Sequence, residues 1–148
     1  MNFNINTEGG NNFIGSGTLD GNGVPPNFFN DIHIRKGFAY CFNYDAYLED
    51  VLLNEATRLT SVILPGMPGY DDNQAHYTYD PAKCEEELKL SKWTAVGEGF
   101  EPAEDGEISL WDTGFRLTLA YNTGNTARQT IGQIMQAEIS AINENFII

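Results

Sequence analysis

The chain has 148 residues, a length that suits one domain with a sizeable hydrophobic core. Eight basic residues stand against 21 acidic ones, and the net charge of −13 disfavours nucleic acid and anionic lipid as partners, because both carry negative charge. Hydrophobic residues make up 41% and charged residues 20%, the balance of a globular chain, and no apolar run approaches the roughly 20 residues of a membrane-spanning helix.

The first third of the chain predicts a strand, a long loop and two helices. Alternating apolar and polar residues predict a short strand over 2–5, and the glycines, asparagines and paired prolines that follow predict an irregular loop over 8–29. Asp31 is the expected N-cap of the first helix. Asp45 is the expected N-cap of a second helix over 46–56, which carries an apolar stripe.

The middle of the chain predicts a strand, an ordered loop and a helix. The strand begins at Arg58 and breaks at Pro65 and Pro68, because proline is too constrained for a regular element interior. Asp80 precedes Pro81, a pair that provides a side-chain acceptor at the N-cap and proline at the first helical position. This is the strongest local helix signal in the chain.

The last third predicts a loop, a strand, a helix and the start of another strand. An acidic, glycine-rich segment indicates a second long loop over 93–112, and apolar residues alternate over 115–121, as in a strand that ends in a turn. Apolar residues at helical spacing then predict a helix over 126–146 with Asn125 or Thr126 as its cap. The final FII is typical of a strand, so the element order predicts an α/β (α+β) fold with helices packed on a mixed β-sheet.

Two cysteines, Cys41 and Cys84, lie 43 positions apart with no CxxC pair and no histidine pair nearby, which disfavours a zinc site. A disulfide between Cys41 and Cys84 is one of the two alternatives. Each cysteine also occupies a position where a small apolar side chain suits an amphipathic helix, and free cysteine is commonly buried. The sequence therefore favours two buried thiols over a bridge.

Four blocks follow one another along nearly the whole chain: DIHIRKGFAYCFNYDAYLEDVLL, LPGMPGY, YTYDPAKCEEELK and FRLTLAYNTGNTARQTIGQIMQAEISAIN. Their order and content resemble the large C-terminal lobe of family 5 extracellular solute-binding proteins. The departures from the family pattern are Gly37, Cys41, Asn43 and Cys84. The resemblance implies that residues 1–148 form a single lobe of a two-lobed class II binding protein, whose N-terminal lobe is missing from this chain.

The resemblance also implies a function. The intact protein would bind a small solute, most readily an oligopeptide, and deliver it to the permease subunits of an ABC importer. It would not be an enzyme and would use no metal or cofactor. It would lie outside the cytoplasm, in the periplasm or as a cell-surface lipoprotein, although the N-terminus of this chain has no secretory signal. Two alternatives stay open: an oligosaccharide-binding protein of the same fold, and the solute-sensing module of a transcriptional regulator.

The expected ligand-binding residues form a strand-to-helix turn and comprise Tyr121, Asn122, Thr123, Asn125 and Arg128. Free backbone N–H groups at a helix N-terminus attract anions such as a carboxylate, and arginine adds a forked charged donor. The helix dipole is positive at this end and disfavours a cation, so we expect Arg128 to have an anionic partner. That partner is either a ligand, as the resemblance implies, or an acid within the lobe.

Other motifs favour structural roles. Residues 20–23, DGNG, are more typical of a plain turn than of a calcium loop, since Val24 and Pro25 follow where oxygen ligands are needed. His33 and His76 have no partnered nucleophile motif, and in so acidic a chain paired carboxylates arise by chance. The large aromatic residues favour core packing over sugar stacking: Trp93, Trp111, Tyr70, Tyr77 and Tyr79.

Overall fold

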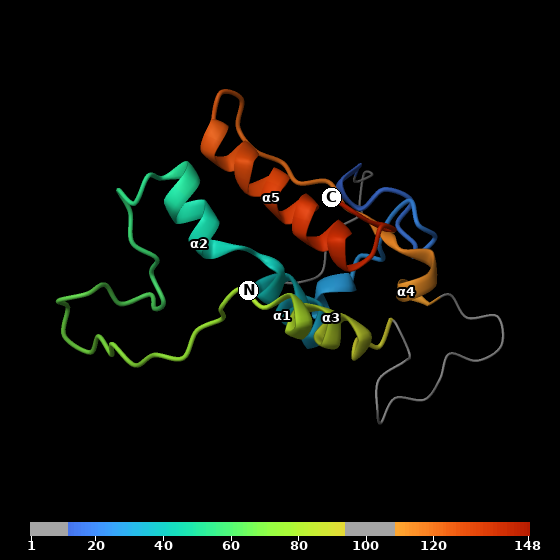
Figure 1. Ribbon diagram of the computed structural model, residues 1–148. Coiled ribbons are helices and arrows are strands. Elements are labelled where there is room, and N and C mark those ends of the chain that lie inside the picture. Colours follow the sequence, from blue (N-terminus) through green and yellow to red (C-terminus); the bar gives the residue numbers. More distant parts are fainter. Residues whose placement is uncertain (1–11, 94–108) are drawn as a thin grey trace.

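A computed structural model describes residues 12–93 and 109–148, which form a helical body with a very small β-sheet and a long projecting loop (Figure 1). The elements in chain order are η1 (Asn12–Ile14), η2 (Phe28–Asn30), α1 (Ile32–Cys41), α2 (Tyr44–Ala46), η3 (Tyr47–Val51), α3 (Pro81–Lys89), α4 (Leu110–Thr113), β1 (Phe115–Arg116), α5 (Thr126–Ile142) and β2 (Phe146–Ile147). Here η1 and η2 are 3-10 turns and η3 is a π-helical turn. The coarse prediction of helices combined with a sheet is confirmed.

Helices α1 and α3 lie side by side at the base of the molecule (Figure 1). Gly37 allows their close approach, because a Cβ atom at this position would lie 2.7 Å from Cδ2 of Leu88. Cys41, the last residue of α1, forms a disulfide with Cys84 in α3. Both cysteines are buried, as the sequence indicated, but the prediction of two free thiols is wrong: the helix crossing brings their Cα atoms to 5.2 Å, within disulfide range.

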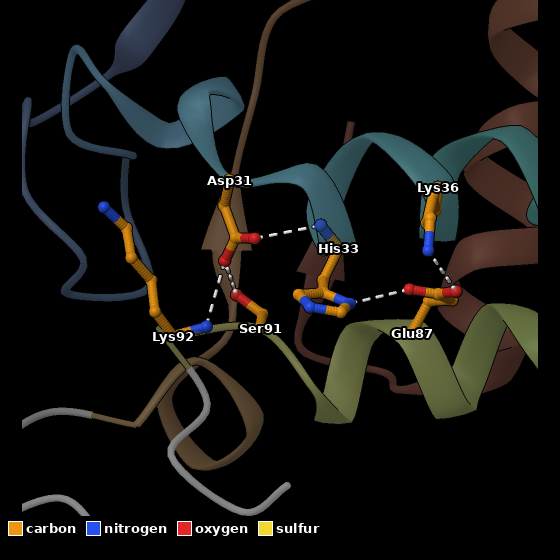
Figure 2. A network of polar contacts seen from close by, with 6 residues as sticks. All are labelled: Asp31, His33, Lys36, Glu87, Ser91 and Lys92. Atoms are coloured by element: carbon orange, nitrogen blue, oxygen red, sulfur yellow. Dashed lines mark hydrogen bonds and ion pairs between the residues drawn. The ribbon is translucent and has the colours of Figure 1, made fainter. Parts of the chain in front are cut away.

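The buried carboxylate of Asp31 joins the start of α1 to the end of α3 (Figure 2). Its Oδ1 accepts a hydrogen bond from the backbone N–H of His33 at 2.9 Å, which confirms the predicted N-cap. Its Oδ2 accepts from the hydroxyl of Ser91 at 2.8 Å and from the backbone N–H of Lys92 at 2.9 Å. One side chain thus accepts from a donor two residues away in sequence and from another 60 residues away.

Glu87 of α3 forms a second set of contacts between the two helices (Figure 2). Its Oε2 lies 2.7 Å from Nδ1 of His33 and its Oε1 lies 3.2 Å from Nζ of Lys36. The hydrogen bond from Lys36 to this carboxylate, together with its negative charge, raises the pKa of Lys36. Because these contacts are partly exposed, each contributes only modestly to stability.

Three phenylalanines from distant segments form the centre of the core. Phe115 and Phe146 stack with ring centroids 4.7 Å apart, and Phe28 lies 5.5 Å from Phe115. Phe115 and Phe146 are also the first paired residues of β1 and β2, which run parallel to each other. Gly114 precedes β1 with φ +77°, and a Cβ atom there would meet the carbonyl oxygen of Asn145, so this site requires glycine. The sheet in the described residues is parallel, and the predicted mixed sheet is not formed there.

Several predicted element boundaries are wrong. The strand expected from Arg58 is absent: all of residues 58–64 are described, and they run as a loop without ladder partners. The strand expected over 115–121 is paired only at its first two residues. The last residues of the loop predicted over 93–112 belong to the helix α4. Strand pairing is a non-local property, so alternation alone did not reveal that a partner was missing.

The second predicted helix begins earlier and ends sooner than expected. Asn43, not Asp45, is its N-cap, because the Asn43 side chain accepts from the backbone N–H of Ala46 at 3.0 Å. The helix widens into the π-turn η3 and stops at Leu52, and the next two residues, Leu53 and Asn54, have positive φ. Left-handed backbone at these positions is incompatible with the continuation of a right-handed helix.

Other predictions agree with the structure. Asp80 caps α3 with Pro81 at its first turn, Asn125 caps α5, and a strand follows α5 at Phe146. The irregular segment before α1 contributes buried residues to the core, among them Ile14, Leu19, Val24 and Phe28. The strand expected over 2–5 and residues 94–108 of the second loop lie outside the described residues.

The first prediction concerns the disulfide. No residue from 42 to 83, all of which the structure describes, is buried, so this segment has no core of its own and depends on closure at its base. Substitution of Cys41→Ala together with Cys84→Ala should lower the free energy of unfolding by about 4 kcal/mol, since the closed loop spans 43 positions. Urea denaturation followed by circular dichroism measures this. Dithiothreitol should destabilise the natural protein and leave the double variant unchanged; equal stability of the natural protein with and without reductant would contradict the assignment.

The second prediction concerns the two aspartate caps. Asp31→Ala should cost about 3 kcal/mol of stability, because it removes a helix cap and leaves the buried Ser91 hydroxyl without its acceptor. Asp80→Ala is the matched control: it removes the cap of α3 and a largely exposed ion pair with Lys83, and should cost about 1 kcal/mol. The loss of unfolding free energy in each variant is measured from its urea denaturation curve. Equal losses in the two variants would show that the contact with Ser91 contributes nothing.

Candidate functional site

The predicted ligand-binding turn joins the extended segment after β1 to the start of α5. The backbone N–H of Asn125 donates to the carbonyl of Asn122 at 3.2 Å, which closes the turn. The Asn125 side chain accepts from the backbone N–H of Arg128 at 2.9 Å and so caps the helix. Tyr121, Asn122, Thr123 and Arg128 are all exposed, and Asn125 is half-buried.

Arg128 is held over the turn by a neutral partner. Its Nη1 donates to the side-chain oxygen of Asn122 at 2.9 Å, and no acid among the described residues lies within 4 Å of its guanidinium. Within the described part of the chain, the alternative that Arg128 pairs with an acid is therefore not supported. A positive charge at a helix N-terminus, fixed by a neutral amide, leaves donors available for an anion.

A hollow of about 550 Å³ lies beside this turn, between the extended segment and α5. Its lining combines apolar side chains with amides, and Tyr121 is the one predicted site residue that contributes to it. The lining residues are Leu117, Thr118, Leu119, Tyr121, Gln129, Gly132, Gln133, Gln136, Ala137 and Ile148. Apolar walls with a few polar groups are typical of ligand pockets.

The glutamines of this hollow were missed by the sequence analysis. Gln129, Gln133 and Gln136 follow one face of α5 at spacings of four and three residues, a polar stripe that helical periodicity could have revealed. Gln136 supports the fold, since its amide donates to the carbonyl of Phe146 and its Oε1 accepts from the backbone N–H of Ile148. Gln129 and Gln133 remain as hydrogen-bonding groups for a ligand.

Tyr79 connects the segment before α3 to α5, the helix that carries this lining. Its hydroxyl donates to Oε2 of Glu138 at 2.6 Å. This hydrogen bond, together with burial, raises the pKa of Tyr79 to about 12. The contact therefore holds the segment before α3 against α5 at neutral pH.

The remaining motifs have structural roles. Asp20 accepts hydrogen bonds from the Ser16 hydroxyl at 2.7 Å and from the backbone N–H of Asn22 at 2.8 Å, as in a plain turn, and the first of these bonds lowers the pKa of its carboxyl group. Trp93 and Trp111 pack against the core, as predicted. Among residues 12–93 and 109–148, no three or more histidine, cysteine or acidic side chains gather in a way that could hold a metal ion. Over the same residues, no helix is both long and apolar enough to cross a bilayer.

Comparison with known proteins places residues 1–147 within one family model, described as bacterial extracellular solute-binding proteins, family 5 Middle. The chain is 35% identical over 81 residues to a dipeptide-binding protein of Escherichia coli, a match that covers 55% of this chain and 14% of that protein. It is 28% identical over 117 residues to di/tripeptide-binding protein 2 of Pseudomonas aeruginosa, covering 77% of this chain and 19% of that protein. The chain thus matches less than a fifth of the length of either curated relative. No solved structure matches it.

The third prediction concerns the Tyr79 contact. Because the pKa of Tyr79 is raised from 10.0 to about 12, its contribution to stability is complete below pH 10 and is lost as the pH rises through 12. Tyr79→Phe should abolish this loss. Spectrophotometric titration at the tyrosinate band should show a phenol that ionises near pH 12 in the natural protein and is missing from the variant. Glu138→Gln is the control and should return Tyr79 toward its ordinary pKa; an unchanged titration would contradict the contact.

Proposed function

The chain belongs to family 5 of the bacterial extracellular solute-binding proteins, and we propose that it contributes to the capture of short peptides outside the cytoplasm for an ABC importer. Proteins of this family are binding proteins, and the chain is not an enzyme. The observation that carries the proposal is the guanidinium of Arg128, which stands at a helix N-terminus with a neutral amide as its partner. A peptide carboxylate is one of the anions that such a group binds, which supports the proposal.

The surroundings of Arg128 suit a peptide better than a bare anion. The adjoining hollow offers apolar surface for a side chain, and Gln129 and Gln133 offer amides for peptide N–H and C=O groups. A hollow of about 550 Å³ is large enough for a small ligand. The names of the two curated relatives, a dipeptide-binding and a di/tripeptide-binding protein, favour short peptides as the solute.

The disulfide supports a location outside the cytoplasm. Structural disulfides persist in oxidising compartments and are rare where thiol reductants are abundant. The Cys41–Cys84 bond is buried in the helix crossing, a position typical of a structural bridge. Neither cysteine belongs to the family pattern, so the disulfide points to an oxidising compartment independently of the family resemblance.

The complete site needs more surface than this chain provides. Arg128, Asn122 and Thr123 are exposed, and the adjoining hollow is open to solvent on one side. We infer that a second lobe of the same protein closes over this face and that the closed form is recognised by the permease subunits of the importer. Hinge closure around a ligand is a common mechanism in two-lobed receptors.

An oligosaccharide remains the second candidate solute. It is favoured by the ring of Tyr121, which is 45% exposed and lines the hollow, because sugars stack on aromatic faces. The tryptophans that could have assisted, Trp93 and Trp111, are engaged in the core. One exposed aromatic ring is a weaker basis for solute recognition than the charged turn.

The fourth prediction tests peptide binding. Isothermal titration of the protein at its full natural length with di- and tripeptides should give binding, and Arg128→Gln should weaken it about tenfold or more, because a charge-assisted hydrogen bond is lost. Arg116→Gln, an exposed arginine on β1, is the matched control and should bind like the natural protein. A diverse peptide pool that shows no binding, together with a glycan array that does, would replace the peptide by an oligosaccharide.

A further inference from the structure

A second hollow lies on another part of the molecule, where α2 and η3 face the loop that follows them. It has a volume of about 370 Å³ and is lined by Tyr44, Asp45, Arg58 and residues of the segment before α3. It shares no lining residue with the hollow beside Arg128. An adjoining hollow of about 280 Å³ also includes Tyr44 and Arg58 and is otherwise walled mainly by apolar and aromatic side chains.

Arg58 stands between these two hollows with its charge exposed to them. Its guanidinium carbon lies 3.3 Å from the centroid of the Tyr44 ring, so the planar group stacks on the ring. The ring is itself fixed, because the Tyr44 hydroxyl donates to the carbonyl of Ala39 at 2.8 Å. Stacking occupies the flat face of a guanidinium and leaves the N–H groups along its edge able to donate.

These donors have no protein acceptor in the described part of the chain. No carboxylate there lies within 4 Å of Arg58, and none of the described hydrogen bonds involves its side chain. Arg58 is half-buried, so the position of its charge limits the solvation of the guanidinium by water. A half-buried cation of this kind is stabilised when an anion binds to it.

We propose that Arg58 and Tyr44 form a binding site for a carboxylate that carries an apolar substituent. The edge of the guanidinium holds the carboxylate through two parallel hydrogen bonds, and the substituent enters the adjoining apolar hollow beside Tyr47 and Leu52. Asp45 lines the polar hollow and is exposed, so its negative charge opposes a dianion such as phosphate more strongly than a monocarboxylate. The C-terminus of a peptide with an apolar last residue and a free aromatic acid share this chemistry.

The site has a definite place in the fold. All residues that line the two hollows lie within the segment from 42 to 83. That segment is closed at its base by the Cys41–Cys84 disulfide. The proposal is independent of the function assigned to the Arg128 turn, because the two hollows have different linings. It adds a second point of carboxylate recognition to the molecule.

Ligand-observed saturation-transfer NMR on the protein at its full natural length tests this site. The probes are N-acetyl-phenylalanine for a peptide C-terminus, 3-phenylpropionate for a free acid, N-acetyl-phenylalaninamide without the charge, and inorganic phosphate. We expect the first two to bind, the amide to bind about tenfold more weakly or worse, and phosphate to bind more weakly than the acids. Binding by one acid alone identifies the source of the carboxylate.

Variants separate this site from the Arg128 turn. Arg58→Gln should weaken N-acetyl-phenylalanine about tenfold or more, and Arg58→Lys should retain part of the binding, since it keeps the charge and loses the fork. Arg116→Gln, which changes the exposed arginine on β1, is the matched control and should leave this affinity unchanged, with folding of each variant checked by circular dichroism. Unchanged binding in Arg58→Gln, equal binding of acid and amide, or phosphate binding as tight as the acids would overturn the proposal. Loss of binding in Arg128→Gln alone would place the ligand at the turn and overturn it equally.

Discussion

The carboxylate of Asp31 is the contact on which the helix pair at the base of the molecule depends. A buried carboxylate is costly unless its oxygens are hydrogen-bonded, and here both are. One oxygen starts α1 and the other holds the chain just after α3, so the two helices cannot separate or shift without exposing an unsatisfied charge. The close approach at Gly37 and the disulfide at Cys41 lie along the same helix pair.

The chain thereby divides into a packed body and a segment, residues 42–83, that has a different source of stability. The body buries phenylalanines from three segments, while residues 42–83 bury none of their side chains fully. This segment is held at its base by the Cys41–Cys84 bond, by the hydrogen bond from the backbone N–H of Asp80 to the carbonyl of Tyr40, and by the contact of Tyr79 with Glu138. Each part presents an arginine without a protein acid, Arg128 on the body and Arg58 on the loop, within the described residues.

The sequence predicted what is decided locally. The helix caps at Asp31, Asp80 and Asn125 were correct, because a cap depends on residues within one turn of each other. Strand pairing and the disulfide depend on partners far away in sequence, and both were predicted wrongly: residues 58–64 found no neighbouring strand, and the cysteines were expected as thiols. The turn at Asn122 and Arg128 was predicted from local pattern, but the stacking of Arg58 on Tyr44 joins residues whose proximity depends on the path of the loop.

The absence of fully buried side chains between Cys41 and Cys84, in a segment that the structure describes throughout, has an evolutionary consequence. Substitutions in a core are constrained by packing on every side, whereas an exposed segment tolerates changes in both sequence and length. Covalent closure at the base lets the body keep its stability while the segment diverges. Such a segment can acquire or lose ligand preferences among related proteins without new compensating changes in the core, and it is also a suitable position for grafting a foreign loop.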